Sequence, residues 1–380
     1  MYQSNEIGLS FYNCHEKRIQ PNIWEELNNG LWKTLTPDNF FYNNTLNSFS
    51  LNKIKPLFKG FQQIIPGTQW NLLNNQLELD LYYPSYVTKC SFKDFIETAA
   101  KYFHSLKAHK IGVHLSGGLD SSLIIGLLHT LNIPFVPIGL KSNSFEFRTE
   151  RKIQEILIEW GDEGLLLDME EYPYYSQLTN IPSHQIPDDD IKSIAGAKAL
   201  AKSFAERGCD IVLTGQGGDS LFVDDISEMK NISFNIGDEF LNTTEQDRIY
   251  GPMKIRLEAF YANKNIIDVI CSARIGQKDD PLKKWARNWA KEILPKELSD
   301  FTYCADFFGQ TIWGLHSAKP VIKDLMEETY YLTNSSLFSP KRITEYLNRD
   351  IFSFEYKEYN HLCSLISIAC WYHSFFNNNN

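Results

Sequence analysis

The stretch Gly112–Ile125, GVHLSGGLDSSLII, decides the fold. An apolar run ends at Leu115 in a turn of glycines, serines and one aspartate, and a second apolar run follows at once. A short apolar run bounded by a glycine turn is typical of a buried strand, and a serine-rich turn before a longer apolar run is typical of a helix start. The stretch therefore predicts a strand, a tight turn and a helix in immediate succession.

The same alternation continues on both sides of this stretch. Segments with continuous apolar cores indicate strands at 110–116, 134–140, 163–169 and 210–219. Apolar residues recur at helical spacing in the segments before and between them, 91–106, 120–132, 148–161 and 193–209. Strands that alternate with helices and are apolar on both faces argue for a parallel sheet. The predicted class is α/β, with a parallel sheet sandwiched by helices.

The two ends of the chain differ from this central part. Residues 1–90 predict a small N-terminal β-containing subdomain, in which an apolar run, a Pro-Gly turn at Pro66 and the alternation LELDLYY indicate a hairpin. Beyond Leu221 the periodicity is mostly helical. We therefore expect two domains, 1–90 and 91–380, the second with a helical C-terminal part.

Composition narrows the function classes. The chain has 380 residues, 43% of them hydrophobic, so it can bury a sizeable core. A net charge of −10 disfavours a general binder of nucleic-acid phosphates, and no apolar run is long enough for a membrane span. The polar start predicts no signal peptide, and the seven cysteines form no C-x-x-C pair, which favours core thiols over a zinc site. We expect a cytoplasmic protein without nucleic-acid or membrane partners.

The first glycine turn has the chemistry of a phosphate site. Ligands of parallel α/β sheets bind at the carboxyl ends of strands, and a helix that starts there presents unpaired N–H groups and a positive dipole end. Glycines allow the backbone to approach a ligand, and serines add hydroxyl donors. Asp120 would repel a bare phosphate, so its presence favours a bound Mg²⁺. The candidate residues are Ser116, Gly117, Gly118, Asp120, Ser121 and Ser122.

A second turn, VLTGQGGDSLF at Val212–Phe222, repeats this design after another predicted strand. Gly215, Gly217 and Gly218 again permit close approach, and Asp219 is a second carboxylate that would share Mg²⁺ with Asp120. The spacing fits neither a Walker A loop, a G-x-G-x-x-G dinucleotide loop nor a G-x-S-x-G nucleophile elbow. The alternatives are a serine-rich helix cap at the first turn and a plain strand terminator at the second.

The two turns together resemble a known family. SGGLDSS resembles the pyrophosphate loop of the N-type ATP pyrophosphatases, and LSGGLDSS with VLTGQGGDSLF is similar to the asparagine-synthetase branch, over residues 91–380. The resemblance implies an adenine nucleotide α-hydrolase-like synthetase fold that uses ATP and Mg²⁺ to adenylate a carboxylate, which an amine then attacks. It also implies that Asp120 and Asp219 hold the metal, and that Leu115, Leu140 and Gly215 line the adenosine site.

The chain departs from the glutamine-dependent members of that family. Residue 2 is Tyr where they carry a catalytic cysteine, and residues 1–90 resemble only a remnant of a glutaminase-type domain. The resemblance therefore shifts to ring-closing relatives. Among these, the chain is most similar to lasso-peptide macrolactam cyclases, because Gln216 precedes GGD and the segment 184–191 reads HQIPDDDI. These imply a peptide substrate, with a leader-peptide-binding protein and a protease as partners. Asp188, Asp189 and Asp190 have a simpler interpretation as a solvated helix start.

A second departure concerns basic residues. The family places a lysine shortly after a Leu-Pro pair, and Phe301, Tyr303 and Cys304 occupy that region here. Lys278, Lys319 and Lys341 are candidate replacements in predicted loops, and the resemblance places Glu258 and Tyr250 near the base position, although a helix face explains them equally well. The alternatives to a peptide cyclase are a small-molecule amide or β-lactam-type synthetase and a degenerate ATP-binding scaffold.

Overall fold

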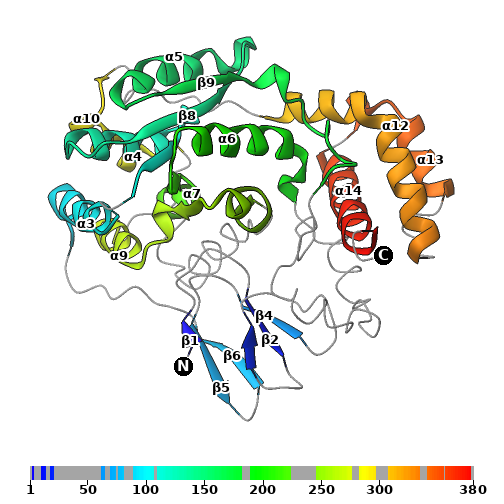
Figure 1. The fold of residues 1–380 in the computed structure, drawn as a ribbon, viewed down its shortest axis with the longest axis horizontal. Helices are drawn as coiled ribbons and strands as arrows, with labels where there is room; N and C mark the ends of the chain where they lie inside the picture. Colours follow the sequence, from blue (N-terminus) through cyan, green and yellow to red (C-terminus); the bar gives the residue numbers. More distant parts are fainter. Residues whose placement is uncertain are drawn as a thin grey trace.

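The computed structural model describes residues 89–106, 109–181, 189–223, 245–275, 282–296, 307–333, 340–354 and 356–377, together with six short strands before residue 81. Its centre is a five-stranded parallel sheet in the order β11-β10-β7-β8-β9 (Figure 1). The strands are β7 Ile111–His114, β8 Val136–Lys141, β9 Leu165–Asp168, β10 Ile211–Thr214 and β11 Arg256–Ala259. The predicted parallel sheet is therefore confirmed.

The four predicted strands are present, and a fifth was missed. β11 pairs with β10 at the edge of the sheet, from Ile211↔Arg256 to Thr214↔Ala259. Its sequence, RLEA, carries two charged residues and lacks the apolar run that marks the other strands. Edge strands tolerate charged side chains because one of their sides has no neighbouring strand, so the sequence pattern gave no signal there.

Helices cover both faces of the sheet (Figure 1). On one face, Val136, Ile138 and Val212 pack in one core with α6 Ile194–Glu206, α12 Phe308–Thr333 and α14 Tyr356–Asn377. On the other, Ile111, Val113 and Leu213 share a core with α3 Phe92–Ser105, α4 Leu119–Thr130, α5 Arg148–Leu157, α9 Lys264–Ala273 and α10 Lys284–Ile293. Apolar side chains on successive strand positions reach opposite faces, and both faces are buried.

Helix boundaries follow local chemistry where the sequence predicted it. Ser91 caps α3 by accepting from the backbone of Asp94, whose side chain in turn accepts from the Ser91 N–H, a capping box. Asp189 and Asp190 open a short 3₁₀ helix, Asp189–Ser193, that leads into α6, which agrees with the interpretation of these acids as a helix start. Asp188 lies outside the described residues.

The C-terminal part is helical, as predicted. α12, α13 Pro340–Asn348 and α14 group at one end of the sheet (Figure 1). Pro320 lies inside α12, although proline removes a helical hydrogen bond and is costly in a helix interior. Buried apolar residues on both sides of it, Leu315 and Ile322, keep α12 in the core. Among the described helices, none is long and apolar enough to cross a bilayer.

The N-terminal region contains β-structure, but its predicted hairpin is wrong. β4 Phe61–Ile64 pairs with β2 Ser10–Asn13, whereas β5 Gln69–Leu73 pairs with β6 Gln76–Asp80. The strands on either side of the Pro-Gly dipeptide therefore belong to two different three-stranded sheets, β3-β2-β4 and β1-β5-β6, completed by β3 Arg18–Gln20 and β1 Tyr2–Gln3. The hairpin is formed one turn later, between β5 and β6. The division into domains at residue 90 stays a prediction.

Candidate functional site

The two glycine turns meet at the centre of the sheet. β7 lies between β10 and β8, so the chain leaves β7 toward one edge of the sheet and later returns to its other side. Parallel α/β sheets bind ligands at such a switch point, outside the carboxyl ends of the strands. The turns after β7 and β10 both lie at that edge, because the strands are parallel and paired at Val113↔Leu213. The predicted neighbourhood of the turns is confirmed.

The first turn is tightly packed. Gly117 has φ +82°, a conformation that side chains disfavour, and a Cβ there would lie 2.5 Å from the Glu150 carbonyl oxygen. Ser116 accepts from the Gly118 N–H at 3.1 Å, and its hydroxyl lies 2.8 Å from that of Ser121. Glycine is thus required here by the close approach of α5, whatever ligand the turn receives.

The serines of this turn divide into two groups. The Ser122 hydroxyl is buried and donates to the Gly118 carbonyl at 2.7 Å, and Ser121 reaches the same oxygen at 3.2 Å. Ser116 is exposed at the surface of the turn. The structure therefore leaves Ser116 as the accessible hydroxyl, while Ser121 and Ser122 hold the first turn of α4.

The glycines of the second turn allow the two turns to pack closely against each other. A Cβ on Gly218 would lie 2.5 Å from Cγ of Asp120, and one on Gly215 would lie 3.1 Å from the Ser121 backbone nitrogen. Gly217, with φ +82°, precedes α7 Gly218–Phe222. The second turn is glycine-rich because Asp120 lies directly against it.

One lysine connects the two carboxylates. Lys283 Nζ donates to Asp120 Oδ1 at 2.9 Å and Oδ2 at 2.7 Å, and lies 2.6 Å from Asp219 Oδ1. The side chains of Lys283 and Asp120 are each 15% exposed, whereas that of Asp219 is 73% exposed. Asp120 and Asp219 therefore converge on one position, as predicted, and the ammonium of Lys283 lies between them. We call these three residues the aspartate–lysine bridge.

The charges of the bridge depend on each other. Burial raises the pKa of Asp120, and the Asp219 carboxylate adds to that rise while Lys283 opposes it. Burial lowers the pKa of Lys283, but the two carboxylates outweigh burial and raise it overall. The lysine therefore stays charged and is the counterion that allows Asp120 to be ionised in a buried position.

The donor set fits Mg²⁺ only together with a ligand. Mg²⁺ in nucleotide enzymes is held by one or two carboxylates, substrate phosphates and water. The bridge offers two carboxylates that already converge on a cation. Among the described residues no group of three or more His, Cys, Asp or Glu could hold a metal alone. Asp120 and Asp219 thus suit a metal that arrives with phosphates.

Sequence reasoning missed Lys283 and Tyr261. Lys283 directly precedes α10 in a left-handed conformation, and α10 packs against α4, which carries Asp120. Tyr261 is buried and donates its hydroxyl to the Asp120 carbonyl at 2.9 Å. The sequence shows helical periodicity at 280–295, but only the packing of α10 on α4 shows which lysine reaches the turns.

Leu115 and Leu140, the expected adenosine contacts, lie side by side at the strand ends. The Gln154 side chain connects them, because its Nε2 donates to the Leu115 carbonyl at 3.0 Å and to the Leu140 carbonyl at 2.8 Å. The Leu115 N–H donates to the Ile138 carbonyl at 2.8 Å. These backbone groups are therefore already hydrogen bonded within the protein, and a role in binding adenosine stays a prediction.

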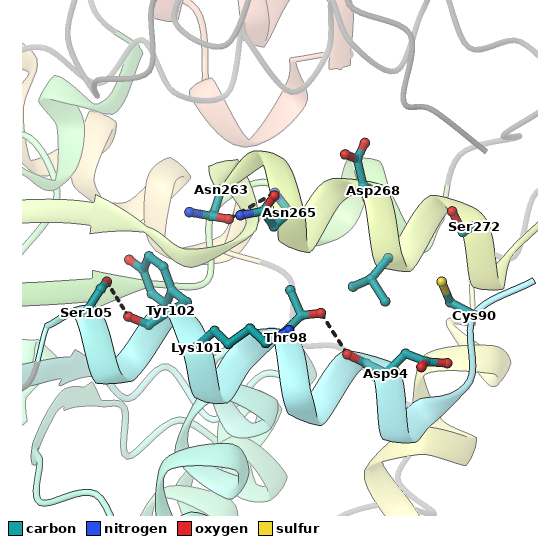
Figure 2. Close-up of a pocket in the computed structure, with 11 residues that line it drawn as sticks. Cys90, Asp94, Thr98, Lys101, Tyr102, Ser105, Asn263, Asn265, Asp268 and Ser272 are labelled. Carbon is teal, nitrogen blue, oxygen red and sulfur yellow. Dashed lines mark hydrogen bonds between the residues drawn. The ribbon is translucent and has the colours of Figure 1, made fainter. Parts of the chain in front are cut away.

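The structure places the base candidates outside the bridge. Glu258 accepts from the Tyr102 hydroxyl and forms an ion pair with Arg256 at 2.6 Å. Tyr102 lines a groove of about 630 Å³ between α3 and α9, which Figure 2 shows with Asp94 and Asp268 on its opposite walls. Tyr250 is buried, and its hydroxyl lies 2.6 Å from Nε2 of His114, the last residue of β7. Neither Glu258 nor Tyr250 is brought to Asp120 by these contacts.

Two of the lysines that were predicted to lie in loops, Lys319 and Lys341, are in helices instead. Lys319 lies within α12 and donates to the Arg349 carbonyl at 3.1 Å, and Lys341 is exposed on α13. Pro320, the residue after Lys319, is also inside this helix. Lys278, Phe301, Tyr303 and Cys304 lie outside the described residues.

Comparisons with known proteins support the resemblance for part of the chain. Residues 104–224, which contain both glycine turns, match the model of the asparagine synthase family. The chain is 27% identical over 199 residues to "Amidase chyE" of Penicillium rubens, an alignment that covers 44% of this chain. It covers 29% of that relative, so this chain spans less than a third of the length of the curated protein it matches.

Two solved structures show a more distant likeness. The NMN synthetase of Francisella tularensis has 14% identity and a TM-score of 0.35, covering 68% of this chain and 94% of that one. The NAD⁺ synthetase of Burkholderia pseudomallei has 14% identity and a TM-score of 0.27, covering 57% and 93%. At these scores the likeness adds nothing to the sheet order and strand pairing described above.

Proposed function

We propose that this chain is an ATP-using carbon–nitrogen ligase that activates a carboxylate as its adenylate and passes the acyl group to an amine. The observation that carries the proposal is the aspartate–lysine bridge, which joins the two glycine turns at the switch point of a parallel sheet. The match of residues 104–224 to the asparagine synthase family supports it. A curated relative named an amidase agrees with chemistry at an amide bond.

Each residue of the bridge has a proposed role. Asp120 and Asp219 would hold Mg²⁺ with the phosphates of ATP, and the metal when bound would neutralise phosphate charge. Lys283 would exchange its carboxylate partners for phosphate oxygens, because an ammonium serves either anion. The accessible Ser116 hydroxyl and the N-terminus of α4 would donate to the phosphates.

As the specific reaction we propose macrolactam formation in a lasso-type peptide, which joins a peptide amine to an Asp or Glu side chain. The support is the sequence around the second turn, with Gln216 before Gly217 and Gly218. Such a cyclase would act with a leader-peptide-binding protein and a protease. Its substrate would be a peptide, in contrast to the small carboxylate of a small-molecule amide or β-lactam-type synthetase.

The test is to incubate the whole protein with ATP, Mg²⁺ and either candidate peptides or small carboxylates with amines. AMP and pyrophosphate, with a peptide product lighter by one water, are the expected result, and formation of ADP would contradict adenylation. Asp120→Asn should lower turnover by about 10²-fold or more while circular dichroism stays unchanged. Asp324→Asn, an exposed acid on α12, is the matched control.

A second candidate is an ATP-binding scaffold without turnover. The observation that favours it is that Lys283 already neutralises Asp120 and Asp219. In that case ATP would bind with the same affinity in the presence of Mg²⁺ and of a chelator, and no AMP would form. In the ligase, Mg²⁺ would tighten ATP binding and Asp120→Asn would abolish that dependence.

A further inference from the structure

A pocket of about 400 Å³ lies at the carboxyl ends of β8 and β9, where α12 covers them. Its walls come from the segment after β8, the segment after β9 and the first turns of α12, and it shares no lining residue with the aspartate–lysine bridge. The volume lies in the range of small-molecule sites, and strand ends of this kind are where such sheets bind ligands.

Contacts between its three walls make the pocket preformed. Glu170 Oε1 accepts from the Ser142 hydroxyl at 2.9 Å and the Asn143 N–H at 2.7 Å, which ties the end of β9 to that of β8. A Cβ on Gly314 would lie 2.7 Å from the Tyr174 carbonyl oxygen, so α12 packs directly on the backbone after β9. The rings of Phe147 and Phe307 are in tilted contact beside the start of α12, with centroids 5.0 Å apart.

The charged residues that line the pocket are Glu146 and Glu170. Within the part of the chain that the structure describes, no lysine or arginine lines it. Among the described residues neither glutamate forms an ion pair, and the Glu146 carboxylate lies 3.6 Å from the Cβ position of Gly309 in the first turn of α12. The basic residues of the surrounding segments have other partners, since Lys141 pairs with Asp168 and Arg151 donates to the Ser142 carbonyl.

Aromatic side chains form the rest of the wall. Trp313 is 63% exposed and packs edge-to-face on Phe352, with ring centroids 5.3 Å apart, so its indole is both supported and accessible. Tyr172 and Tyr174 lie on the facing segment. Burial, and after it the Asp190 carboxylate, raises the pKa of Tyr174 to about 12, which keeps its hydroxyl neutral. Aromatic faces attract cations through the ring quadrupole, and carboxylates add a direct charge.

We propose that this pocket binds an organic cation, a protonated amine carried on an apolar or aromatic body. Two carboxylates supply the charge, and Trp313 with the tyrosines receives the body. The cation is either a free small amine or a basic side chain of a peptide, and both present the same chemistry. The protonated amine is a recognition group here and takes no part in the proposed bond formation. The inference goes beyond the proposed ligase and is tested without ATP.

Isothermal titration calorimetry of the whole protein at low ionic strength tests the charge requirement. Tyramine is the cationic probe, and tyrosol, which replaces the ammonium by a hydroxyl, is its neutral counterpart. Tyramine should bind about tenfold more tightly than tyrosol. Equal affinities of tyramine and tyrosol would overturn the proposal. So would the absence of any binding of tyramine, tyrosol, a lysine peptide or its norleucine counterpart. Loss of ATP chemistry would leave this result unaffected, so failures of the two proposals can be distinguished.

Variants assign the preference to this pocket. Glu146→Gln and Glu170→Gln together should reduce the tyramine preference to about twofold or less, and Trp313→Ala should weaken both probes. The controls are Glu159→Gln, an exposed glutamate elsewhere, and Tyr331→Ala, a 76% exposed aromatic on the same helix. Unchanged melting temperatures show that the variants fold. A preference that survives the double substitution would contradict the assignment.

A peptide arm distinguishes the two sources of the cation. Acetyl-Gly-Lys-Gly-amide is compared with the same peptide carrying norleucine. Tighter binding of the lysine peptide than of tyramine indicates a peptide side chain as the occupant, and the reverse indicates a free amine. Either result supports the pocket as a cation site, provided that Glu146→Gln and Glu170→Gln together remove the preference for the cationic ligand.

Discussion

The two glycine turns are similar in sequence and different in structure. Asp120 of the first turn is 15% exposed and held by α4, whereas Asp219 of the second is 73% exposed. Gly117 of the first turn makes room for α5, but Gly215 and Gly218 of the second make room for Asp120 itself. The first turn is therefore packed against the helices of the domain, whereas the second turn is packed against Asp120 of the first.

This comparison shows that a glycine-rich turn does not by itself indicate that a ligand approaches the backbone. Two of the three glycines in the second turn are explained by the neighbouring turn alone. The feature that points to a ligand is the convergence of two carboxylates on one cation. Substitutions in and around the two turns test how unequal they are.

The largest expected effect is on the bridge. Lys283→Met leaves Asp120 buried beside another carboxylate and without the cation that it contacts directly. Removal of one partner from a buried ion pair typically costs about 3 to 5 kcal/mol. Urea denaturation at neutral pH should show a loss of that order in the free energy of unfolding. Added Mg²⁺ should stabilise this variant more than the wild type, because the carboxylate pair is then open to a cation.

Lys284→Met is the matched control for this substitution. Lys284 is the next residue, is exposed and should change stability by less than about 0.5 kcal/mol. Equal stability of the two variants would show that the bridge does not hold the turns together.

The next effect is a dependence of stability on pH. We expect it from β7, the strand before the first turn, and not from β10, the strand before the second. Burial lowers the pKa of His114, the last residue of β7, from 6.5 to about 4. The unfolded chain therefore binds this proton more readily, so stability is present above pH 6.5 and is lost as the pH falls toward 4. The loss should reach about 3 kcal/mol at the acid end. Denaturation curves between pH 4 and 7.5 measure it.

His114→Gln should flatten that pH dependence, whereas His109→Gln, an exposed histidine, should leave the slope unchanged. The corresponding residue of β10, Thr214, does not titrate. A slope that persists in His114→Gln would assign the acid sensitivity to another group.

A smaller effect tests the contact between the turns. Gly218→Ala places a methyl group 2.5 Å from Asp120 Cγ, and overpacking of this kind costs about 1 to 3 kcal/mol. Gly118→Ala is the control, since its Cβ meets only the movable Ser116 hydroxyl at 3.3 Å. The melting temperature of Gly218→Ala should be clearly below that of Gly118→Ala. The reverse order would contradict close packing of the second turn on Asp120.

The smallest effect is expected for the exposed carboxylate. Asp219→Asn removes a largely solvent-exposed partner of Lys283, and such ion pairs contribute about 1 kcal/mol or less. Its free energy of unfolding should stay close to that of Asp324→Asn, while Mg²⁺-dependent ATP binding weakens. A large loss of stability would mean that Asp219, like Asp120, supports the fold.

Much of the fold could be predicted because its signals are local. Continuous apolar runs such as those of β7 and β10 are buried on both faces and have few other interpretations. The capping box at Ser91 fixes the start of α3 within a few residues of chain. β11 and the pairing of β4 with β2 were missed because each depends on a partner far away in the chain.

The sequence by itself determined the parallel α/β sheet and the two glycine turns that carry Asp120 and Asp219, because strand, turn and helix propensities act over a few residues. Only the tertiary structure decided that Lys283 joins the two aspartates, that Glu258 lies with Tyr102 instead, and that Glu146, Glu170 and Trp313 line one pocket. These groups are far apart in the chain, and the packing of α10 on α4 and of α12 over the strand ends brings them together.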